Sequence, residues 1–281
     1  MKQLIITADD YGMSQAVNQA IQEGIENGII TSTNVMMNMP FCDDTDRIRG
    51  KGASIGLHWN LTCGKPVLPP EQVPGLVDRD GNFHSVSEFH RLYKSGKIPD
   101  AEIEKELTEQ YRRYFQIWGF PDYWNSHENV HLSIRVFRVF LKTAIRLNIG
   151  KMRSYNRIYV PAKSGKKSSS VLWTLLEPAK RTVFAYWKRK AAKNGILSPD
   201  GKICCLDEKD VHDFEYILSH TQWGNHRNAE FTIHPATACD SPFFGNMTDN
   251  RLTEYRMVTD AGVHSALEKA QTELISFDGI A

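Results

Sequence analysis

Short apolar runs alternate along this chain with segments whose apolar residues recur every three or four positions. Residues 2–8 and 54–60 contain apolar runs that predict buried strands. Residues 14–25 carry apolar side chains at helical spacing, and Ser14 stands where a helix N-cap is expected. This order predicts a strand followed by a helix, which is the repeating unit of a parallel α/β fold.

The same alternation continues to the end of the sequence. Further strands are predicted at 32–37, 123–126, 151–155, 230–233 and 274–277, and further helices after Pro40 and at 100–118, 134–147, 250–260 and 263–271. Asp100 is the expected N-cap of the helix 100–118, Gly119 is expected to end it, and Ser133 is the expected cap of the next helix. We therefore expect an α/β, (β/α) barrel-like fold, an irregular parallel barrel of seven or eight strands, with an open doubly wound sheet as the alternative.

Two segments interrupt the alternation. Residues 63–86 contain several Pro and Gly residues without periodicity, which predicts a functional loop or lid. Residues 161–192 combine a Lys- and Ser-rich run with a basic, aromatic stretch and are interpreted as an insertion. Because one α/β barrel commonly occupies about 250 residues, we expect a single domain over residues 1–281.

Composition narrows the choice of partners and compartment. The net charge is +1 and the pI is about 7.7, so the basic excess typical of nucleic-acid binders is absent. No apolar run reaches the length of a membrane span, and the start of the chain lacks the long apolar core of a secretory signal. Five cysteines without CxxC spacing predict neither a disulfide framework nor a thiolate zinc site. We expect a cytoplasmic protein that binds a small molecule, without nucleic acid or membrane partners.

Carboxylate and imidazole groups follow three of the predicted strands. Asp9 and Asp10 follow the first, His58 lies at the end of another, and His127 follows the short run 123–126. The carboxyl ends of parallel strands meet on one face of a barrel or sheet, where catalytic sites are usually built. One carboxylate and two imidazoles suit a divalent metal with open coordination positions, so we expect one metal site here.

Each signature also has a simpler structural interpretation. The two aspartates can form a turn that caps the following helix, and a lone histidine at a strand end, such as His58, is more often a hydrogen-bonded core residue than a ligand. In an extended chain Asp9 and Asp10 cannot point the same way, so they are expected to take separate roles. His234 ends a late strand in the same manner and is a second titratable candidate.

The segment 127–131 also matches the HExxH pattern of zinc proteases. In that interpretation His127 and His131 bind zinc on one helix face and Glu128 is the general base. The pattern requires a helix, whereas here a short aromatic strand precedes His127 and the best helix cap, Ser133, follows His131. A metalloprotease is therefore the less favoured alternative.

Four motifs together resemble the YdjC-like family, whose best-known members are chitooligosaccharide deacetylases. These are the segments 7–12 (TADDYG), 56–62 (GLHWNLT), 126–131 (SHENVH) and 234–236 (HPA), which occur in family order. The resemblance covers most of the chain. It implies a barrel-like fold, a hydrolase that removes N-acetyl groups from short amino-sugar oligosaccharides, and a homodimer.

The resemblance also implies a role for each matching residue. Asp10, His58 and His127 would hold one divalent metal, magnesium or zinc, which would polarise the acetamide carbonyl and activate a water. Asp9 would take the proton of that water as the base, and His234 is the candidate acid for the departing amine.

The hypothesis also includes residues that contact the sugar, and one of the four motifs departs from the family pattern. Tyr11, Trp59, Asn60 and Arg153 are expected to contact the substrate, and His131 and Glu128 are additional candidates at the site. In the third motif Asn125 replaces an aspartate of the family, and Glu128 and Asn129 replace histidines. Since a carboxylate beside a metal-bound histidine strengthens metal binding, the change also leaves a weakly active or non-catalytic metal- and sugar-binding barrel as an alternative.

Overall fold

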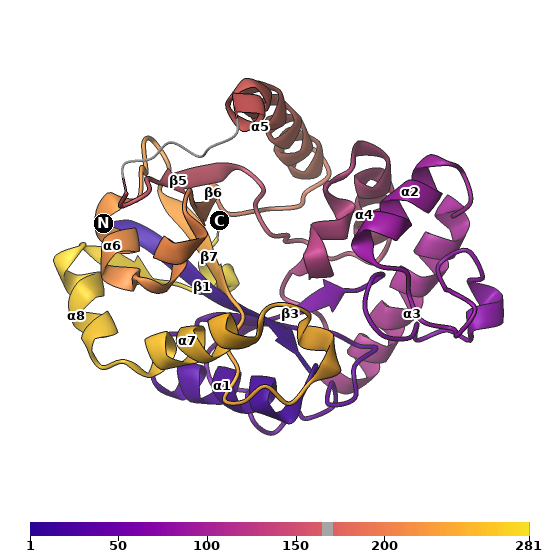
Figure 1. Ribbon diagram of the computed structural model, residues 1–281, viewed down its shortest axis with the longest axis horizontal. Coiled ribbons are helices and arrows are strands. Elements are labelled where there is room, and N and C mark those ends of the chain that lie inside the picture. Colours follow the sequence, from indigo (N-terminus) through magenta and orange to yellow (C-terminus); the bar gives the residue numbers. More distant parts are fainter. Residues whose placement is uncertain (165–170, 281) are drawn as a thin grey trace.

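A computed structural model of the protein describes residues 1–164 and 171–280, and its centre is one curled sheet of parallel strands (Figure 1). The strands are β1 (Lys2–Tyr11), β2 (Ser32–Val35), β3 (Ser54–Trp59), β4 (Trp124–Ser126), β5 (Arg157–Val160), β6 (Gly201–Cys205), β7 (Asn228–Ile233) and β8 (Thr272–Leu274). Their spatial order is β4-β3-β2-β1-β7-β6-β5, and β8 pairs with the first residues of β1. The predicted α/β barrel-like fold is confirmed, with a sheet that curls into a half-barrel.

Isolated backbone pairs, and not a continuous ladder, connect β4 to the chain that precedes β5. The backbone N–H of Trp124 donates to Lys151 O at 3.0 Å, and Arg153 N–H donates to Trp124 O at 3.1 Å. Met152 N–H in turn donates to Leu197 O at 2.9 Å. The segment 151–153 therefore lies beside β4 and carries Arg153 to the inside of the barrel, although β5 itself begins only at Arg157.

Helices surround the curled sheet, as Figure 1 shows. They are α1 (Gln15–Glu26), α2 (Val86–Lys94), α3 (Asp100–Trp118), α4 (Ile134–Arg146), α5 (Val171–Ala192), α6 (Phe214–His220), α7 (Thr248–Thr259) and α8 (Gly262–Lys269). The core contains apolar residues from both layers, among them Leu4, Ile6, Val17 and Leu107, none of which is more than 1% exposed. Burial of these faces, worth about 25 cal/mol per Å², fixes the helices on the sheet.

The caps and bounds of the helices agree in part with those predicted from the sequence. Ser14 and Ser133 cap α1 and α4 as predicted, with the side chains accepting from Val17 N and Val136 N. Helix α3 has the predicted bounds and ends at Gly119, but Asp100 is its first residue and Pro99 its N-cap. The helix expected after Pro40 is wrong, because that segment forms a series of turns.

The structure also describes the segment 63–86 and most of the segment 161–192. The loop 63–86 packs onto the barrel, because Val73 and Leu76 are fully buried and the carboxylate of Glu106 accepts the backbone N–H groups of Val67 and Leu68. The predicted insertion 161–192 contains α5, while its residues 165–170 lie outside the described part of the chain. In the described residues no helix has the length and apolar character that crossing a membrane requires.

Candidate metal and catalytic site

A cavity of about 390 Å³ opens at the carboxyl ends of the central strands. Its walls include Asp9 and Asp10 of β1, His58 of β3, His127 after β4 and His234 after β7. The structure thus brings the strand-end residues together, as expected when parallel strands end on one face. The segment Phe243–Met247 covers one side of this cavity.

The aspartates reach the cavity through a bulge in β1. Ala8 pairs with Thr33 and Tyr11 with Val35, so Asp9 and Asp10 together face a single residue of β2. Asp10 has a φ of 75°, in the left-handed region. Bulges redirect side chains, and here both carboxylates enter the cavity. The expectation that the two side chains point in different directions applied to an extended chain, and the chain is not extended at Asp10. The separate roles of Asp9 and Asp10 stay a prediction.

Next to the bulge, Gly12 allows β1 to turn. Its φ is 97°, and a Cβ at this position would lie 2.9 Å from Cys42 Cα. A side chain is therefore excluded both by backbone conformation and by space. The Gly12 N–H donates to Asn18 Oδ1 at 2.7 Å, which ties the turn to the first helix.

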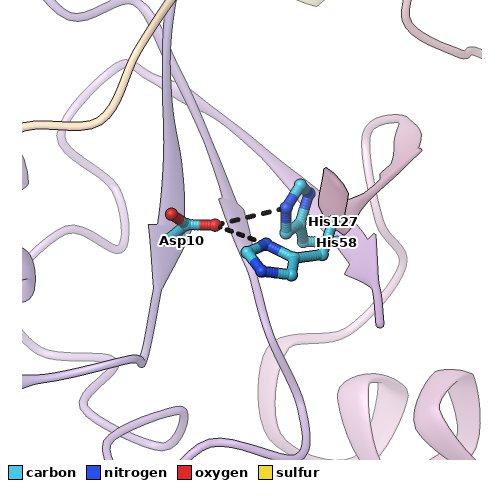
Figure 2. Close-up of side chains that lie close together, drawn as sticks. All are labelled: Asp10, His58 and His127. Atoms are coloured by element: carbon cyan, nitrogen blue, oxygen red, sulfur yellow. Dashed lines mark hydrogen bonds and ion pairs between the residues drawn. The ribbon is translucent and has the colours of Figure 1, made fainter. Parts of the chain in front are cut away.

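Asp10 directs one carboxylate oxygen toward two neighbouring imidazoles, those of His58 and His127, as Figure 2 shows. Its Oδ1 is 3.0 Å from His127 Nδ1 and 3.4 Å from His58 Nε2. Burial would raise the pKa of Asp10, but Arg251 and His127 hold it well below its usual value. Burial would lower the pKa of His127, but Asp10 raises it to about 10. The three residues therefore form a strongly coupled group.

The group fits a divalent metal ion. One ligand atom from each of Asp10, His58 and His127 lies within 4.8 Å of the other two. His58 Nε2 is buried and has no hydrogen-bond partner among the described residues. A carboxylate with two imidazoles is a common set for zinc and other first-row metals with open positions.

Asp9 is held by a different set of partners. Arg153 binds it through two hydrogen bonds, Nη1 to Oδ2 at 2.7 Å and Nη2 to Oδ1 at 2.6 Å. Arg153 Nε also donates to Glu230 Oε1 at 3.0 Å, and Asn34 Nδ2 donates to Asp9 Oδ1 at 2.5 Å. Burial would raise the pKa of Asp9, but Arg153 holds it well below its usual value. Asp9 is therefore a fixed, ionised carboxylate.

His234 lies beside Asp9, because β7 pairs with β1 and Ile233 is in register with Ala8. Its Nε2 is 3.8 Å from Asp9 Oδ2, and its Nδ1 is 3.9 Å from Glu254 Oε2. Glu254 also accepts the backbone N–H of His234 at 2.5 Å. Burial lowers the pKa of His234 to about 4 and raises that of Glu254 to about 7. At neutral pH the imidazole is thus neutral, while Glu254 titrates.

Helix α7 supplies two residues that the motifs did not reveal. Arg251 donates to Asp10 Oδ2 at 2.5 Å, and Glu254, one turn later, holds His234. The spacing of three residues places both on the same face of α7. Glu230 is a third residue that the motifs did not reveal. A carboxylate within the mostly apolar strand β7 could have indicated it, and the side chain is fully buried there.

Three predicted substrate contacts lie away from the cavity. Trp59 is fully buried against Trp124 and Phe140, and its Nε1 donates to Leu107 O. The Tyr11 hydroxyl donates to Asp44 O, and the amide of Asn60 organises the loop that follows β3. These interpretations are corrected, because none of the three residues lines the cavity, whereas Arg153 does.

The HExxH pattern is divided between two environments. His127 enters the cavity, but His131 is fully buried among Trp124, Phe140 and Tyr155, and its Nδ1 bonds to Ser126 Oγ. Glu128 and Asn129, with φ of 50° and 51°, break the helix that a zinc protease requires. Glu128 lies at the exposed rim of the cavity. His131 cannot join His127 at an ion, so the protease interpretation is rejected.

Fold and cavity together define an α/β barrel protein with an Asp/His/His centre suited to a divalent ion. A sequence model described as YdjC-like protein matches residues 3–269, and the chain belongs to that family.

Relatives with assigned names share part of this sequence. A carbohydrate deacetylase of Geobacillus stearothermophilus is 35% identical over 147 residues, which are 52% of this chain and 57% of the relative. A chitooligosaccharide deacetylase of Escherichia fergusonii is 32% identical over 167 residues, covering 57% and 64% of the two chains. The matches thus span about three fifths of these relatives.

A solved structure matches along nearly the whole chain. It comes from Enterococcus faecalis V583 and is provisionally described as a cellobiose-phosphate cleavage protein. The TM-score is 0.76 at 25% sequence identity, and the match covers 99% of this chain and 98% of the other.

Proposed function

We propose that the protein is a metal-dependent hydrolase that removes N-acetyl groups from short amino-sugar oligosaccharides. The observation that carries the proposal is one cavity in which Asp10, His58 and His127 adjoin an ionised Asp9 and a neutral His234. Membership of the YdjC-like family and the names of the matched relatives support the same reaction.

The donor set indicates which ion the residues would hold. Two imidazoles and one carboxylate favour zinc or another first-row metal over magnesium, which prefers oxygen ligands. A bound ion would supply a Lewis acid for the acetamide carbonyl and a water of lowered pKa. Arg251 binds the second oxygen of Asp10 and so directs Oδ1 toward the two histidines.

Asp9 is the proposed base. Its two hydrogen bonds to Arg153 fix the plane of the carboxylate, and its lowered pKa keeps it ionised. Glu230 binds the far side of Arg153, so the guanidinium is held from both ends. Such fixed orientation is what a catalytic base requires to act without reorganisation.

His234 is the proposed acid for the departing amine. With a pKa of about 4 it is neutral at pH 7, so it has to receive a proton before it can deliver one as imidazolium. Asp9 is 3.8 Å away, a separation that one small movement or one water bridges. The proton that Asp9 takes from water can therefore reach the amine nitrogen through His234.

The sugar would bind against the segment Phe243–Met247. Phe243 lines the cavity and is 36% exposed, so its ring offers an accessible apolar face beside the polar centre. Most of the cavity lining is polar or charged, and Phe243, Phe244 and Met247 supply its apolar part. Phe243 thus replaces Trp59 as the aromatic residue proposed to contact the substrate.

The activity test uses purified protein, a divalent metal and diacetylchitobiose. Metal-stimulated release of acetate is expected, with a chelator-treated sample as the matched control. Failure to release acetate from any N-acetylated sugar, with zinc, cobalt and magnesium each tried, would contradict the proposal. Sugar binding without turnover would instead support the alternative of a non-catalytic barrel, which the replacement at Asn125 favours.

Compartment, assembly and domain organisation follow from the resemblance and the sequence pattern. We propose a cytoplasmic homodimer with one catalytic domain over residues 1–281. Light scattering on the purified protein would measure the mass of the particle, and a monomer at micromolar concentration would contradict the dimer.

A further inference from the structure

Asn125 lies between the two parts of the site. It is fully buried on β4 and pairs in register with His58 of β3. Its amide contacts His58 Nδ1 on one side and lies close to Arg153 and Asn34 on the other. It therefore touches both the candidate ligand set and the group that holds Asp9.

The neighbours of this amide are mostly hydrogen-bond donors. Arg153 presents Nη1 and Nη2, and Asn34 presents Nδ2, which is already directed at Asp9. The structure directs Asn125 Oδ1 at His58 Nδ1. With the amide turned over, its oxygen instead accepts from Arg153 Nη2 at 2.9 Å, Arg153 Nη1 at 3.2 Å and Asn34 Nδ2 at 3.0 Å. Its NH₂ then donates to His58 Nδ1 at 2.5 Å. An amide has only one acceptor atom, so the oxygen of Asn125 can face either His58 or the donors of Arg153 and Asn34, but not both.

This orientation determines which nitrogen of His58 carries the proton. If Nδ1 accepts from Asn125, the hydrogen of a neutral imidazole is on Nε2, which faces Asp10 Oδ1 at 3.4 Å. Because Nδ1 contacts Asn125 and Nε2 faces Asp10, Nε2 is the atom that His58 would offer to an ion, and a protonated nitrogen cannot be a ligand. Binding then requires the proton to move to Nδ1 and the amide to reverse.

The reversed amide meets unfavourable neighbours. Its oxygen would accept from His58 Nδ1–H, but its NH₂ would face the N–H groups of Arg153 and Asn34 across 2.9–3.2 Å. Only Asp9 Oδ1, at 3.5 Å, is an acceptor on that side. A carboxylate at position 125 would accept from all these donors at once.

We propose that Asn125 is a positioning residue that holds the metal-free His58 in its Nε2–H form and thereby weakens binding of the divalent ion. The inference rests on the metal site of the proposed function. An aspartate at position 125 would favour the Nδ1–H form, leave Nε2 free to bind, and strengthen the site.

The experiment compares Asn125→Asp with the wild-type protein, both freed of metal. Titration calorimetry with zinc and with cobalt is expected to show binding about 10- to 100-fold tighter for the variant, the range seen for partners of metal-bound histidines. Nitrogen-15 NMR of labelled histidines is expected to show the Nε2–H form of His58 in the wild type and the Nδ1–H form in the variant. Neither measurement uses substrate, so absent deacetylase activity would not affect them.

A matched control separates hydrogen bonding from added charge. Asn129→Asp adds the same charge at the cavity wall, in a left-handed conformation that aspartate tolerates, and position 129 makes no hydrogen bond to His58 among the described residues. Its affinity is expected to change less than about threefold, well below the effect expected at position 125. Equal gains in both variants, no gain in Asn125→Asp, or an Nδ1–H form of His58 in the metal-free wild type would each overturn the proposal. If Asn125→Asp does not fold, the wild-type NMR result still decides.

Discussion

The two halves of the chain contribute different parts of the cavity. The first 130 residues supply Asp10, His58 and His127, the group suited to an ion. Residues after 150 supply Arg153 and His234, which adjoin Asp9, and Glu254, which holds His234. Both halves meet at β1, because this strand pairs with β2 on one side and with β7 on the other.

The difference shows how two adjacent carboxylates acquire separate roles. Asp9 and Asp10 share one cavity and are both buried, so exposure does not distinguish them. Their hydrogen-bond and ion-pair partners distinguish them. Asp10 has two imidazoles beside one oxygen, whereas Asp9 has a guanidinium across both oxygens. One is arranged to bind a cation and the other to exchange a proton.

The largest effect is expected from Asp10→Asn. The amide removes the charge at the centre of the Asp/His/His group, so metal affinity should fall at least 100-fold and acetate release by roughly 10³-fold or more. Calorimetry with zinc and an acetate assay measure the two losses. Circular dichroism serves as the control for folding, and retained metal affinity would contradict the assignment of Asp10.

Asp9→Asn tests the other half of the comparison. Loss of the proposed base should lower acetate release by roughly 10²- to 10⁴-fold, while metal affinity stays within about threefold of the wild type. The same two assays apply. A joint loss of metal binding and turnover would show that the two aspartates do not have separate roles.

Glu254→Gln tests the buried carboxyl behind His234. Its pKa is raised from 4.5 to about 7, so the native state holds a proton that the unfolded state releases, and stability is lost as pH rises from about 4.5 to 7. The shift corresponds to about 3 kcal/mol across that window. Glutamine does not titrate, so chemical denaturation of the variant at pH 5, 6, 7 and 8 should show a flatter profile. Parallel profiles for the two proteins would refute the raised pKa.

The smallest effect is expected from Ser126→Ala. Ser126 lines the cavity, but its Oγ bonds to His131 and not to Asp10, His58 or His127, so the variant should lose about 1–3 kcal/mol of stability and keep its metal affinity. Denaturant titration and calorimetry measure both quantities. A fall in metal affinity as large as that of Asp10→Asn would mean that His131 belongs to the metal site.

Regular elements of the fold were predictable from local patterns. The apolar face and terminal Gly119 defined α3, and the strand-end position of polar residues was sufficient to bring Asp10, His58 and His127 together. The segment after Pro40 was mispredicted, since its short polar residues bond locally, as Thr45 N–H does with Asp43 O.

The remaining features depend on contacts between distant residues. The bulge that turns Asp9 into the cavity depends on the register between β1 and β2, which a strand pattern does not specify. Arg251 reaches Asp10 across 241 positions of sequence, and its helix has no motif that marks it. Trp59 was misassigned because alternation along β3 places it opposite to His58, in the layer between sheet and helices.

The left-handed backbone at Asp10 has a consequence for which substitutions this position tolerates. With a φ of 75°, only glycine, asparagine and aspartate fit without strain, and other residues cost roughly 1–3 kcal/mol of stability before any chemistry is considered. A saturation library at position 10 should therefore divide into the wild type with two well-folded variants, those with glycine and asparagine, and a larger set depleted in abundance. Among the three, only aspartate offers an anionic ligand, so backbone geometry and chemistry together leave this position a single functional solution.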